Sequence, residues 1–320
     1  IAMRYIVVTI VSLAALTIAI YFEKISLALN EHYSAVDEFK EQRQNVTYGD
    51  GRPIYALCFY GLTRSVNWTI ESINKHIIKP ILKSNFTKDA KIDLFVHTFR
   101  VQVLNNPRSG EVGITYTHMD DIELLQPTKF MITSQDEFDR INNDMTKSTT
   151  VKWAKIYREQ ATIQNILRAQ HSLATVWELM FSFMEEKKIE YEGVVFLRPD
   201  LMYFKDIDIT EKKLANDTIY IPECSSYGGY NDRFAYGKIG PMRVYANRKS
   251  SNMDPENESL GEVNSEKFLM RHITVNNMRV KHIDMEFARI RSNGKAARND
   301  KVFVDAACKR GDKRACTLKV

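Results

Sequence analysis

The sequence predicts an α/β fold in which a mostly parallel sheet is flanked by helices. Short apolar runs rich in Val, Ile, Phe and Tyr alternate along the chain with longer segments whose apolar residues recur every three or four positions. The first pattern is typical of buried strands, and the second is typical of helices that pack one side against a sheet. Their alternation indicates parallel strands joined by helical crossovers.

The first half of the predicted domain contains three strands and a helix. Ile54–Tyr60 is an apolar run with aromatic and β-branched residues, and a turn with the sequence GLTRS follows it. Ser65–Leu82 has its apolar residues at helical spacing. Lys91–Phe99 and Thr128–Thr133 are again apolar runs bounded by polar residues, so we expect them to be the second and third strands.

The second half repeats this alternation. Lys155–Lys187 is amphipathic over its whole length, which predicts one long helix or a helix pair, and Gly193–Leu197 is a buried strand. Four shorter segments follow. Strands are expected at Asp217–Pro222 and Asp232–Gly237, a helix at Asn264–Asn277 and an extended segment at Met278–Arg291.

The composition fits one large domain and gives little support to nucleic-acid binding. The chain has 320 residues, of which 44% are hydrophobic and 27% charged. The net charge of +5 is spread along the sequence, without an arginine-rich tract or zinc-finger spacing. We therefore expect a globular domain over residues 53–320 and no nucleic-acid partner.

The N-terminal segment predicts a membrane anchor. Tyr5–Phe22 is a run of 18 residues without a charge, close to the roughly 20 residues that cross a bilayer. A cleaved signal peptide is the alternative, but the run is long for one and no small-x-small cleavage site follows it. A buried core helix is a weaker alternative. We expect a cytoplasmic tail at residues 1–4, a signal anchor at 5–22 and a stem at 23–52.

Glycosylation sequons indicate the side of the membrane on which the domain lies. Five occur, and their asparagines are Asn45, Asn67, Asn85, Asn216 and Asn257. They favour a lumenal domain and hence a single-pass type II protein of the Golgi or endoplasmic reticulum. Of the four cysteines, Cys308 and Cys316 are close enough in sequence to pair in an oxidising compartment.

Three candidate sites follow from the rule that ligands of open α/β sheets bind beyond the carboxyl ends of the strands. Gly61 and Arg64 follow the first strand, where a glycine lets backbone amides approach an anionic ligand. His97 ends the second strand, either as a donor to a ligand or as a structural histidine. Arg198 and Asp200 follow the Gly193–Leu197 strand across a proline, and they either bind a diphosphate and a cation or form a structural ion pair.

Two further segments contain polar side chains suited to a ligand. Arg158 lies early in the long predicted helix, where an exposed helical face explains it equally well. Asn231, Asp232 and Arg233 lie between a glycine pair and a strand, with tyrosines nearby. Such triplets are often turns, but amides and carboxylates beside aromatic rings also suit sugar hydroxyls.

With these segments together, the chain resembles glycosyltransferases of the GT-A type. The segment VVFLRPDLMYF occupies the place of the GT-A strand that ends in Asp-x-Asp, with Arg198 replacing the first aspartate and Asp200 matching the second. LRPD, NDRFAYGK and PMRVYANR are similar to segments of poorly characterised glycosyltransferase-like proteins. The resemblance covers Ile54 to about Gly294, and it implies a GT-A-like (Rossmann-like) fold and sugar transfer from a nucleotide-sugar to a glycan, glycoprotein or glycolipid.

The resemblance also implies roles for the candidate residues. Gly61, Arg64 and His97 would contact the nucleotide and Arg158 its phosphates, while Asn231 and Arg233 would bind the donor. Asp232 would activate the acceptor as a general base or hold hydroxyls of the donor sugar.

The missing first aspartate leaves the use of a metal ion open. We expect Asp200 to bind Mn²⁺ or Mg²⁺ with water and diphosphate oxygens; the alternative is that Arg198 neutralises part of the diphosphate charge itself.

Two other functions share parts of this pattern. A Golgi-type sulfotransferase would use YGLTRS as its phosphosulfate loop, but no lysine or Gly-Thr pair completes that loop and LRPD would have no role. A catalytically inactive, membrane-anchored glycan-binding protein would need the aromatic residues near Asn231 but not Asp200.

Overall fold

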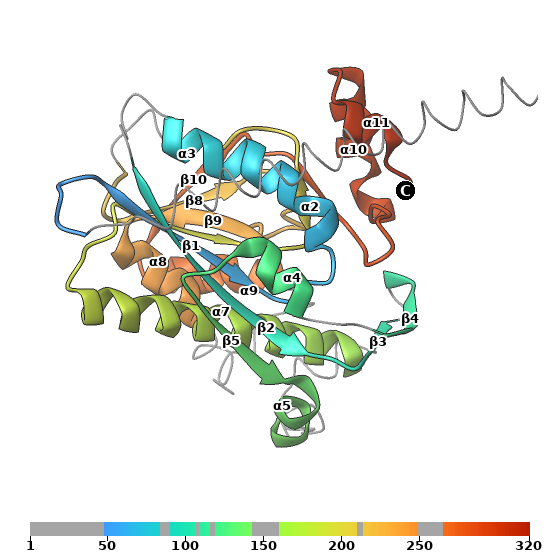
Figure 1. Cartoon of the computed structure of the whole chain (residues 1–320), viewed down its shortest axis with the longest axis horizontal. Coiled ribbons are helices and arrows are strands. Elements are labelled where there is room, and N and C mark those ends of the chain that lie inside the picture. Colours follow the sequence, from blue (N-terminus) through green and yellow to red (C-terminus); the bar gives the residue numbers. More distant parts are fainter. Residues whose placement is uncertain are drawn as a thin grey trace, which may run out of the picture. The chain divides into compact units, whose positions relative to one another are not determined.

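A seven-stranded sheet forms the centre of the fold (Figure 1). The computed structural model describes residues 48–83, 90–106, 109–115, 119–142, 160–209, 214–248 and 265–320. The strands of this sheet are β1 (Ile54–Tyr60), β2 (Lys91–Arg100), β5 (Lys129–Ser134), β6 (Gly193–Leu197), β8 (Thr218–Pro222), β9 (Phe234–Gly237) and β10 (Arg279–Ile283). They lie in the order β10-β8-β9-β6-β1-β2-β5.

The sheet is mostly parallel, which confirms the predicted fold class. β1 pairs parallel with both β2 and β6, β2 with β5, and β10 with β8, while β9 runs antiparallel between β6 and β8. The chain passes from β1 to β2 and β5 on one side and returns to form β6 on the other side of β1. The carboxyl ends of β1 and β6 therefore flank the switch point where ligands of such sheets bind.

The central strands of the sheet are buried throughout because helices cover both of its faces. Every residue of β1 and β6 is buried. On one face lie α7 (Gln160–Lys187), α8 (Ile239–Ala246) and α9 (Ser265–Val275), whose apolar side chains join those of the strands in one core. On the other face lie α2 (Val66–Ile73) and α3 (Lys79–Lys83) (Figure 1).

The first predicted helix is one continuous helical segment with a wider turn in its middle. A π-helical turn, η1 (Asn74–Ile78), joins α2 to α3. Pro80 has no backbone N–H to donate to the preceding turn. The carbonyl of His76 accepts a hydrogen bond from the backbone N–H of Ile207 at 2.8 Å instead. The proline thus loosens the helix where another segment of the chain replaces the missing donor.

Some elements were not predicted from the sequence. They are the hairpin β3 (Val103–Asn106) and β4 (Glu111–Thr115), α4 (Met119–Leu125), α5 (Gln135–Ile141), β7 (Leu201–Tyr203), and α10 (Lys301–Lys309) with α11 (Lys313–Thr317). The strand β11 (Phe287–Arg289), which pairs with β7, lies within the predicted extended segment Met278–Arg291. The last two helices form a second, smaller core with β7 and β11 around Phe204, Ile290 and Val304. A disulfide joins Cys308 to Cys316 within this helix pair.

The predicted anchor and most of the predicted stem lie outside the described residues. Within the described ranges, no helix has the length and apolar character needed to cross a bilayer. The end of the expected stem packs on the sheet, because Tyr48 donates a hydrogen bond to Asp93 at 2.9 Å and Asp50 pairs with Lys91 at 2.7 Å. Asn67 and Asn216 are exposed, as glycosylation requires, and the other three sequons lie outside the described residues.

The disulfide should contribute measurably to stability. Cys308 and Cys316 are separated by 8 positions, so the bond closes a short loop and should stabilise the fold by roughly 2–3 kcal/mol. We expect a reducing agent to lower the midpoint of urea unfolding, measured by circular dichroism. A variant carrying both Cys308→Ser and Cys316→Ser should be insensitive to the reductant. Equal stability of the double variant and the oxidised wild type would contradict a stabilising role.

Candidate functional site

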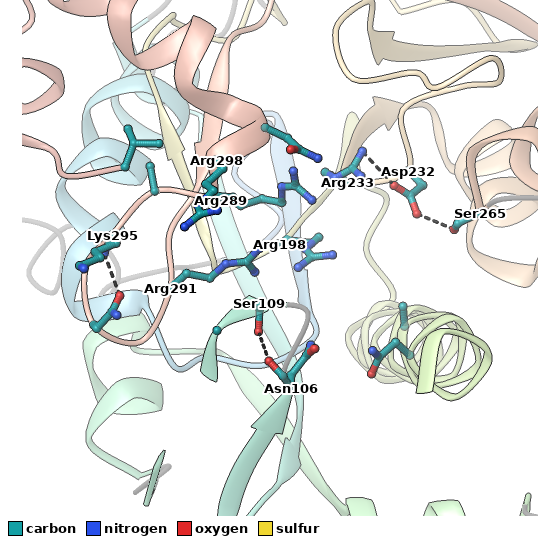
Figure 2. Close-up of a pocket in the computed structure, with 18 of the residues that line it drawn as sticks. Asn106, Ser109, Arg198, Asp232, Arg233, Ser265, Arg289, Arg291, Lys295 and Arg298 are labelled. Atoms are coloured by element: carbon teal, nitrogen blue, oxygen red, sulfur yellow. Dashed lines mark hydrogen bonds and ion pairs between the residues drawn. The ribbon is translucent and has the colours of Figure 1, made fainter. Parts of the chain in front are cut away.

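A cavity of about 790 Å³ lies at the switch point of the sheet (Figure 2). Its walls come from the segment after β6, the segment before β9, α7, α9, the β3–β4 hairpin and the segment after β11. The charged residues of the wall are Arg198, Asp232, Arg233, Glu266, Arg289, Arg291, Lys295 and Arg298. Six cationic side chains thus face two carboxylates, so the cavity suits an anionic ligand.

Arg198 and Asp200 form a bidentate ion pair at the end of β6. Pro199 ends the strand, and its carbonyl accepts a hydrogen bond from the hydroxyl of Thr69 at 2.7 Å. Nε of Arg198 donates to Oδ1 of Asp200 at 2.8 Å, and Nη2 donates to Oδ2 at 2.6 Å. The Asp200 side chain is only 2% exposed, whereas that of Arg198 is 30% exposed and reaches the cavity. The carboxylate therefore holds the guanidinium at the cavity wall.

The ion pair keeps both members charged. Burial alone would raise the pKa of Asp200, but the attraction of Arg198 and its two hydrogen bonds hold that pKa well below its usual value. Burial likewise opposes the charge of Arg198, and the same carboxylate raises the pKa of this guanidinium above its usual value. Asp200 is consequently an anion at every pH at which the protein is expected to work.

The surroundings of Asp200 do not fit a divalent cation. Both of its oxygens already accept hydrogen bonds from Arg198. In the part of the chain that the structure describes, no group of three His, Cys, Asp or Glu side chains is placed to hold a metal ion. Mg²⁺ and Mn²⁺ prefer several oxygen ligands, and a guanidinium bound to the same carboxylate repels them.

Arg64 lies behind this pair and links it to the β3–β4 hairpin. Nε of Arg64 donates to Oε1 of Glu111 at 2.8 Å, while Nη2 lies 4.0 Å from Asp200. The same Glu111 accepts hydrogen bonds from the hydroxyl of Ser109 at 2.7 Å and from the backbone N–H of Ser292 at 2.9 Å. Arg64 is thus committed to Glu111 and does not line the cavity itself.

Residues Arg289–Arg298 form a tight turn of the chain that we call the basic hairpin. Its ends are joined by the bridge between Ile290 and Ala296. The backbone N–H of Ile290 donates to the carbonyl of Asp200 at 2.8 Å, and the carbonyl of Ile290 accepts from the hydroxyl of Ser65 at 2.7 Å. The basic hairpin is therefore attached directly to the segments that follow β1 and β6.

A glycine allows this hairpin to turn against α2. Gly294 has φ +76°, a conformation that side chains disfavour, and a Cβ there would lie 2.9 Å from the ring of Trp68. The indole N–H of Trp68 also donates to the carbonyl of Ser292 at 3.3 Å. Figure 2 shows Arg289, Arg291 and Arg298 of the hairpin near Arg198, all four of which line the cavity.

Asp232 and Arg233 line the opposite side of the cavity (Figure 2). The hydroxyl of Tyr60, at the end of β1, donates to the backbone carbonyl of Asp232 at 2.5 Å, and Ser265 donates to its carboxylate at 2.5 Å. Arg233 lies 3.3 Å from the Asp232 carboxylate and donates to Glu266 at 2.9 Å. These contacts fix Asp232 at the wall of the cavity.

The cations around Asp232 determine its protonation. Burial alone would raise the pKa of this carboxyl group, but Arg233, Arg248, the Ser265 hydroxyl and Arg198 together lower it below its usual value. Asp232 is therefore ionised at neutral pH. A carboxylate in this state accepts hydrogen bonds from hydroxyl groups readily and is a weaker base than an ordinary aspartate.

Three other predicted residues do not line the cavity. They form hydrogen bonds that hold together the segments around it. The backbone N–H of Gly61 donates to the hydroxyl of Ser172. His97 is buried between Ser172 and Thr133 at 2.7 and 2.9 Å, and burial lowers its pKa to about 3. Asn231 donates to the carbonyl of Cys224 at 2.7 Å and accepts from the backbone N–H of Arg233 at 2.9 Å. Arg158 lies outside the described residues.

The arginines of the basic hairpin were missed in the sequence analysis. Arg289 and Arg291 alternate along an extended segment, so their side chains point to the same side of it, and Lys295 and Arg298 follow the turn. This alternation was a usable signal. What the sequence does not contain is the antiparallel pairing of β11 with β7, which brings the segment to the end of β6.

A family model described as "Domain of unknown function (DUF7796)" matches residues 51–297. The chain belongs to this family. The matched range of the DUF7796 domain includes the ion pair of Arg198 and Asp200, Asp232, and most of the basic hairpin. No curated protein matches the sequence.

Two solved glycosyltransferase structures are similar to this DUF7796 protein. One is the apo form of the glycosyltransferase GlyE of Streptococcus pneumoniae TIGR4, with 8% identity, a TM-score of 0.30 and coverage of 72% of this chain and 45% of that one. The other is the apo structure of the bifunctional glycosyltransferase WbbM, with 10% identity, a TM-score of 0.32 and coverage of 75% and 40%. The chain spans less than half the length of either protein.

The buried carboxylate makes stability depend on pH. Because the pKa of Asp200 is lower in the folded protein than the usual value of about 3.9, the unfolded chain takes up the proton first on acidification. The stabilisation is complete above about pH 5 and is lost progressively as the pH falls through 4 and below. We expect Asp200→Asn to cost on the order of 2–3 kcal/mol at pH 7 and to reduce the loss of stability on acidification.

The matched control is Asp305→Asn, which removes an exposed carboxylate paired with Lys301. Urea unfolding at several pH values between 3 and 7 would measure both variants. The assignment is wrong if Asp200→Asn has the same stability at pH 7 as Asp305→Asn and the same pH dependence.

Proposed function

We propose that the protein is a glycosyltransferase that uses a nucleotide-sugar donor and transfers the sugar to a hydroxyl of a glycan, protein or lipid. The observation that carries this proposal is the cationic cavity at the ends of β1 and β6, with the Asp232 carboxylate in its wall. Cations suit the diphosphate of the donor, and a fixed carboxylate suits sugar hydroxyls. The similarity of LRPD and NDRFAYGK to glycosyltransferase-like proteins supports the same function.

The cavity can promote cleavage of the bond between the sugar and the diphosphate. As that bond breaks, negative charge grows on the leaving diphosphate while an acceptor oxygen bonds to the anomeric carbon and passes its proton to Asp232 or to an oxygen of the leaving diphosphate. The cationic side chains are already in place and would stabilise this charge without having to reorganise. Arg198 is the best placed of them at the strand end, because Asp200 fixes it by two hydrogen bonds.

Asp232 is proposed to contact the sugars. Its lowered pKa favours a carboxylate that accepts hydrogen bonds from hydroxyls, of the donor sugar or of the acceptor, over one that removes a proton early in the reaction. The side chain of Arg233 lies 5.5 Å from the ring centre of the exposed Tyr227, so an aromatic face lies beside this arginine of the wall. Such faces are suited to the apolar side of a sugar ring.

The cellular setting belongs to the same proposal. The disulfide between Cys308 and Cys316 and the exposed sequons at Asn67 and Asn216 fit a domain in an oxidising, lumenal compartment. We propose that residues 5–22 anchor this domain to a Golgi or endoplasmic-reticulum membrane as a type II protein.

A sulfotransferase would also need a cationic cavity, and a glycan-binding protein would need its polar walls. Thermal-shift measurements on the purified chain, with UDP-sugars, GDP-sugars, 3′-phosphoadenosine 5′-phosphosulfate and free glycans, would separate these functions. We expect a nucleotide-sugar to stabilise the protein and to be turned over. Stabilisation by the phosphosulfate compound alone would favour sulfate transfer, and stabilisation by glycans alone would favour a binding protein.

Asp232→Asn tests the proposed contact with the sugars. Loss of the carboxylate should lower the rate of sugar transfer by about 100-fold or more, because a positioned acid–base or hydroxyl-binding group is removed. Transfer or hydrolysis of the donor that the screen identifies is the measurement, with Asp305→Asn as the control. Thermal melting of both variants is needed, since Asp232 also balances Arg233. A correctly folded Asp232→Asn protein with normal transfer would remove Asp232 from the mechanism.

A further inference from the structure

The six cationic side chains of the cavity fall into two groups. Three have carboxylate partners, since Arg198 pairs with Asp200, Arg233 with Glu266 and Arg289 with Asp300. The other three, Arg291, Lys295 and Arg298, form no ion pair with any of the residues that the structure describes. All three belong to the basic hairpin, so its turn concentrates positive side chains without an ion-pair partner at the cavity.

Of these three charges, that of Arg291 destabilises the folded protein most. It is half-buried, and burial is the main factor that lowers the pKa of its guanidinium, with repulsion from Arg64 and Arg289 adding to it against the attraction of Asp200 and Glu111. A cation in such a place destabilises the protein that contains it unless an anion joins it. Lys295 and Arg298 are exposed and carry a smaller cost.

The hairpin that carries these charges is held from several sides. Ser65 and Asp200 bond to Ile290, and Glu111 bonds to Ser292. Gly294 packs against Trp68 on the outer side. Donors that are fixed before the ligand arrives lose little entropy on binding, so the hairpin is preorganised for an anion.

We infer that Arg291 and Arg298, together with Arg198, bind the diphosphate group of the ligand directly, and that this binding needs no divalent cation. The inference rests on the proposed function for the identity of the ligand. Guanidinium groups bind phosphate oxygens through paired N–H donors and stay charged at any working pH. They can thereby supply the charge that a metal ion would otherwise supply, at a place where Asp200 is already bound to Arg198.

Isothermal titration of the purified chain with inorganic pyrophosphate tests this inference. We expect binding in the presence of EDTA, with an affinity that changes less than about twofold when Mg²⁺ or Mn²⁺ replaces the chelator. Arg291→Gln and Arg298→Gln should each weaken binding by roughly tenfold or more, because each removes a charge-assisted contact. Arg291→Lys should restore part of the affinity, since it keeps the charge but not the paired donors.

The matched control is Arg279→Gln, which removes an exposed arginine that pairs with Asp217 at the start of β10. It should bind pyrophosphate as the wild type does. Thermal melting gives a second measurement that a merely structural role would not reproduce. In the absence of ligand, Arg291→Gln should melt at the same temperature as the wild type or higher, because it removes an unfavourable charge.

Three results would overturn the inference: pyrophosphate binding that requires Mg²⁺ or Mn²⁺, normal binding by both glutamine variants, or no binding of pyrophosphate by the wild type. Failure of the proposed function is a separate result. A chain that binds pyrophosphate through Arg291 and Arg298 but turns over no nucleotide-sugar would keep the anion site and remove the glycosyltransferase. A chain that transfers sugar only with a metal ion would keep the proposed glycosyltransferase function and overturn the inference that the diphosphate binds without a metal ion.

Discussion

The bidentate ion pair between Arg198 and Asp200 is the interaction on which the rest of the site depends. Asp200 is buried and uses its carboxylate to fix Arg198 at the cavity wall. The backbone carbonyl of the same residue accepts the hydrogen bond that holds the basic hairpin. One residue thus positions a cation from the end of β6 and a group of cations from a segment about ninety positions later in the chain. Pro199 makes this possible by ending the strand between them.

The order of the sheet explains why these segments meet. β1 and β6 are neighbours, so the segments that follow them start at the same edge. Tyr60 at the end of β1 then holds the backbone of Asp232, and Ser65 a few residues later holds Ile290. Both walls of the cavity are consequently attached to the end of one central strand.

Much of the fold could be predicted from the sequence, because the strands buried on both faces have continuous apolar runs and the helices have a clear period. The candidate site could be predicted only where residues directly follow such strands, as Arg198 and Asp200 do. A structural role was one of the two alternatives expected for His97, but its partner could not be predicted, and neither could the role of Gly61. The partner of both, Ser172, lies in the middle of a helix more than seventy positions away. The basic hairpin was missed since its place depends on two short antiparallel strands with little pattern of their own.

Trp68 gives the site an optical reporter of its own. The chain has three tryptophans. Trp177 is buried in the main core, Trp153 lies outside the described residues, and the half-exposed indole of Trp68 lies against Gly294 and bonds to Ser292. Any movement of the hairpin changes the solvent and the hydrogen bond around this ring, and therefore its emission. The emission of the unlabelled protein thus reports whether the hairpin stays in place when the cavity is occupied, without a chromophore on the ligand.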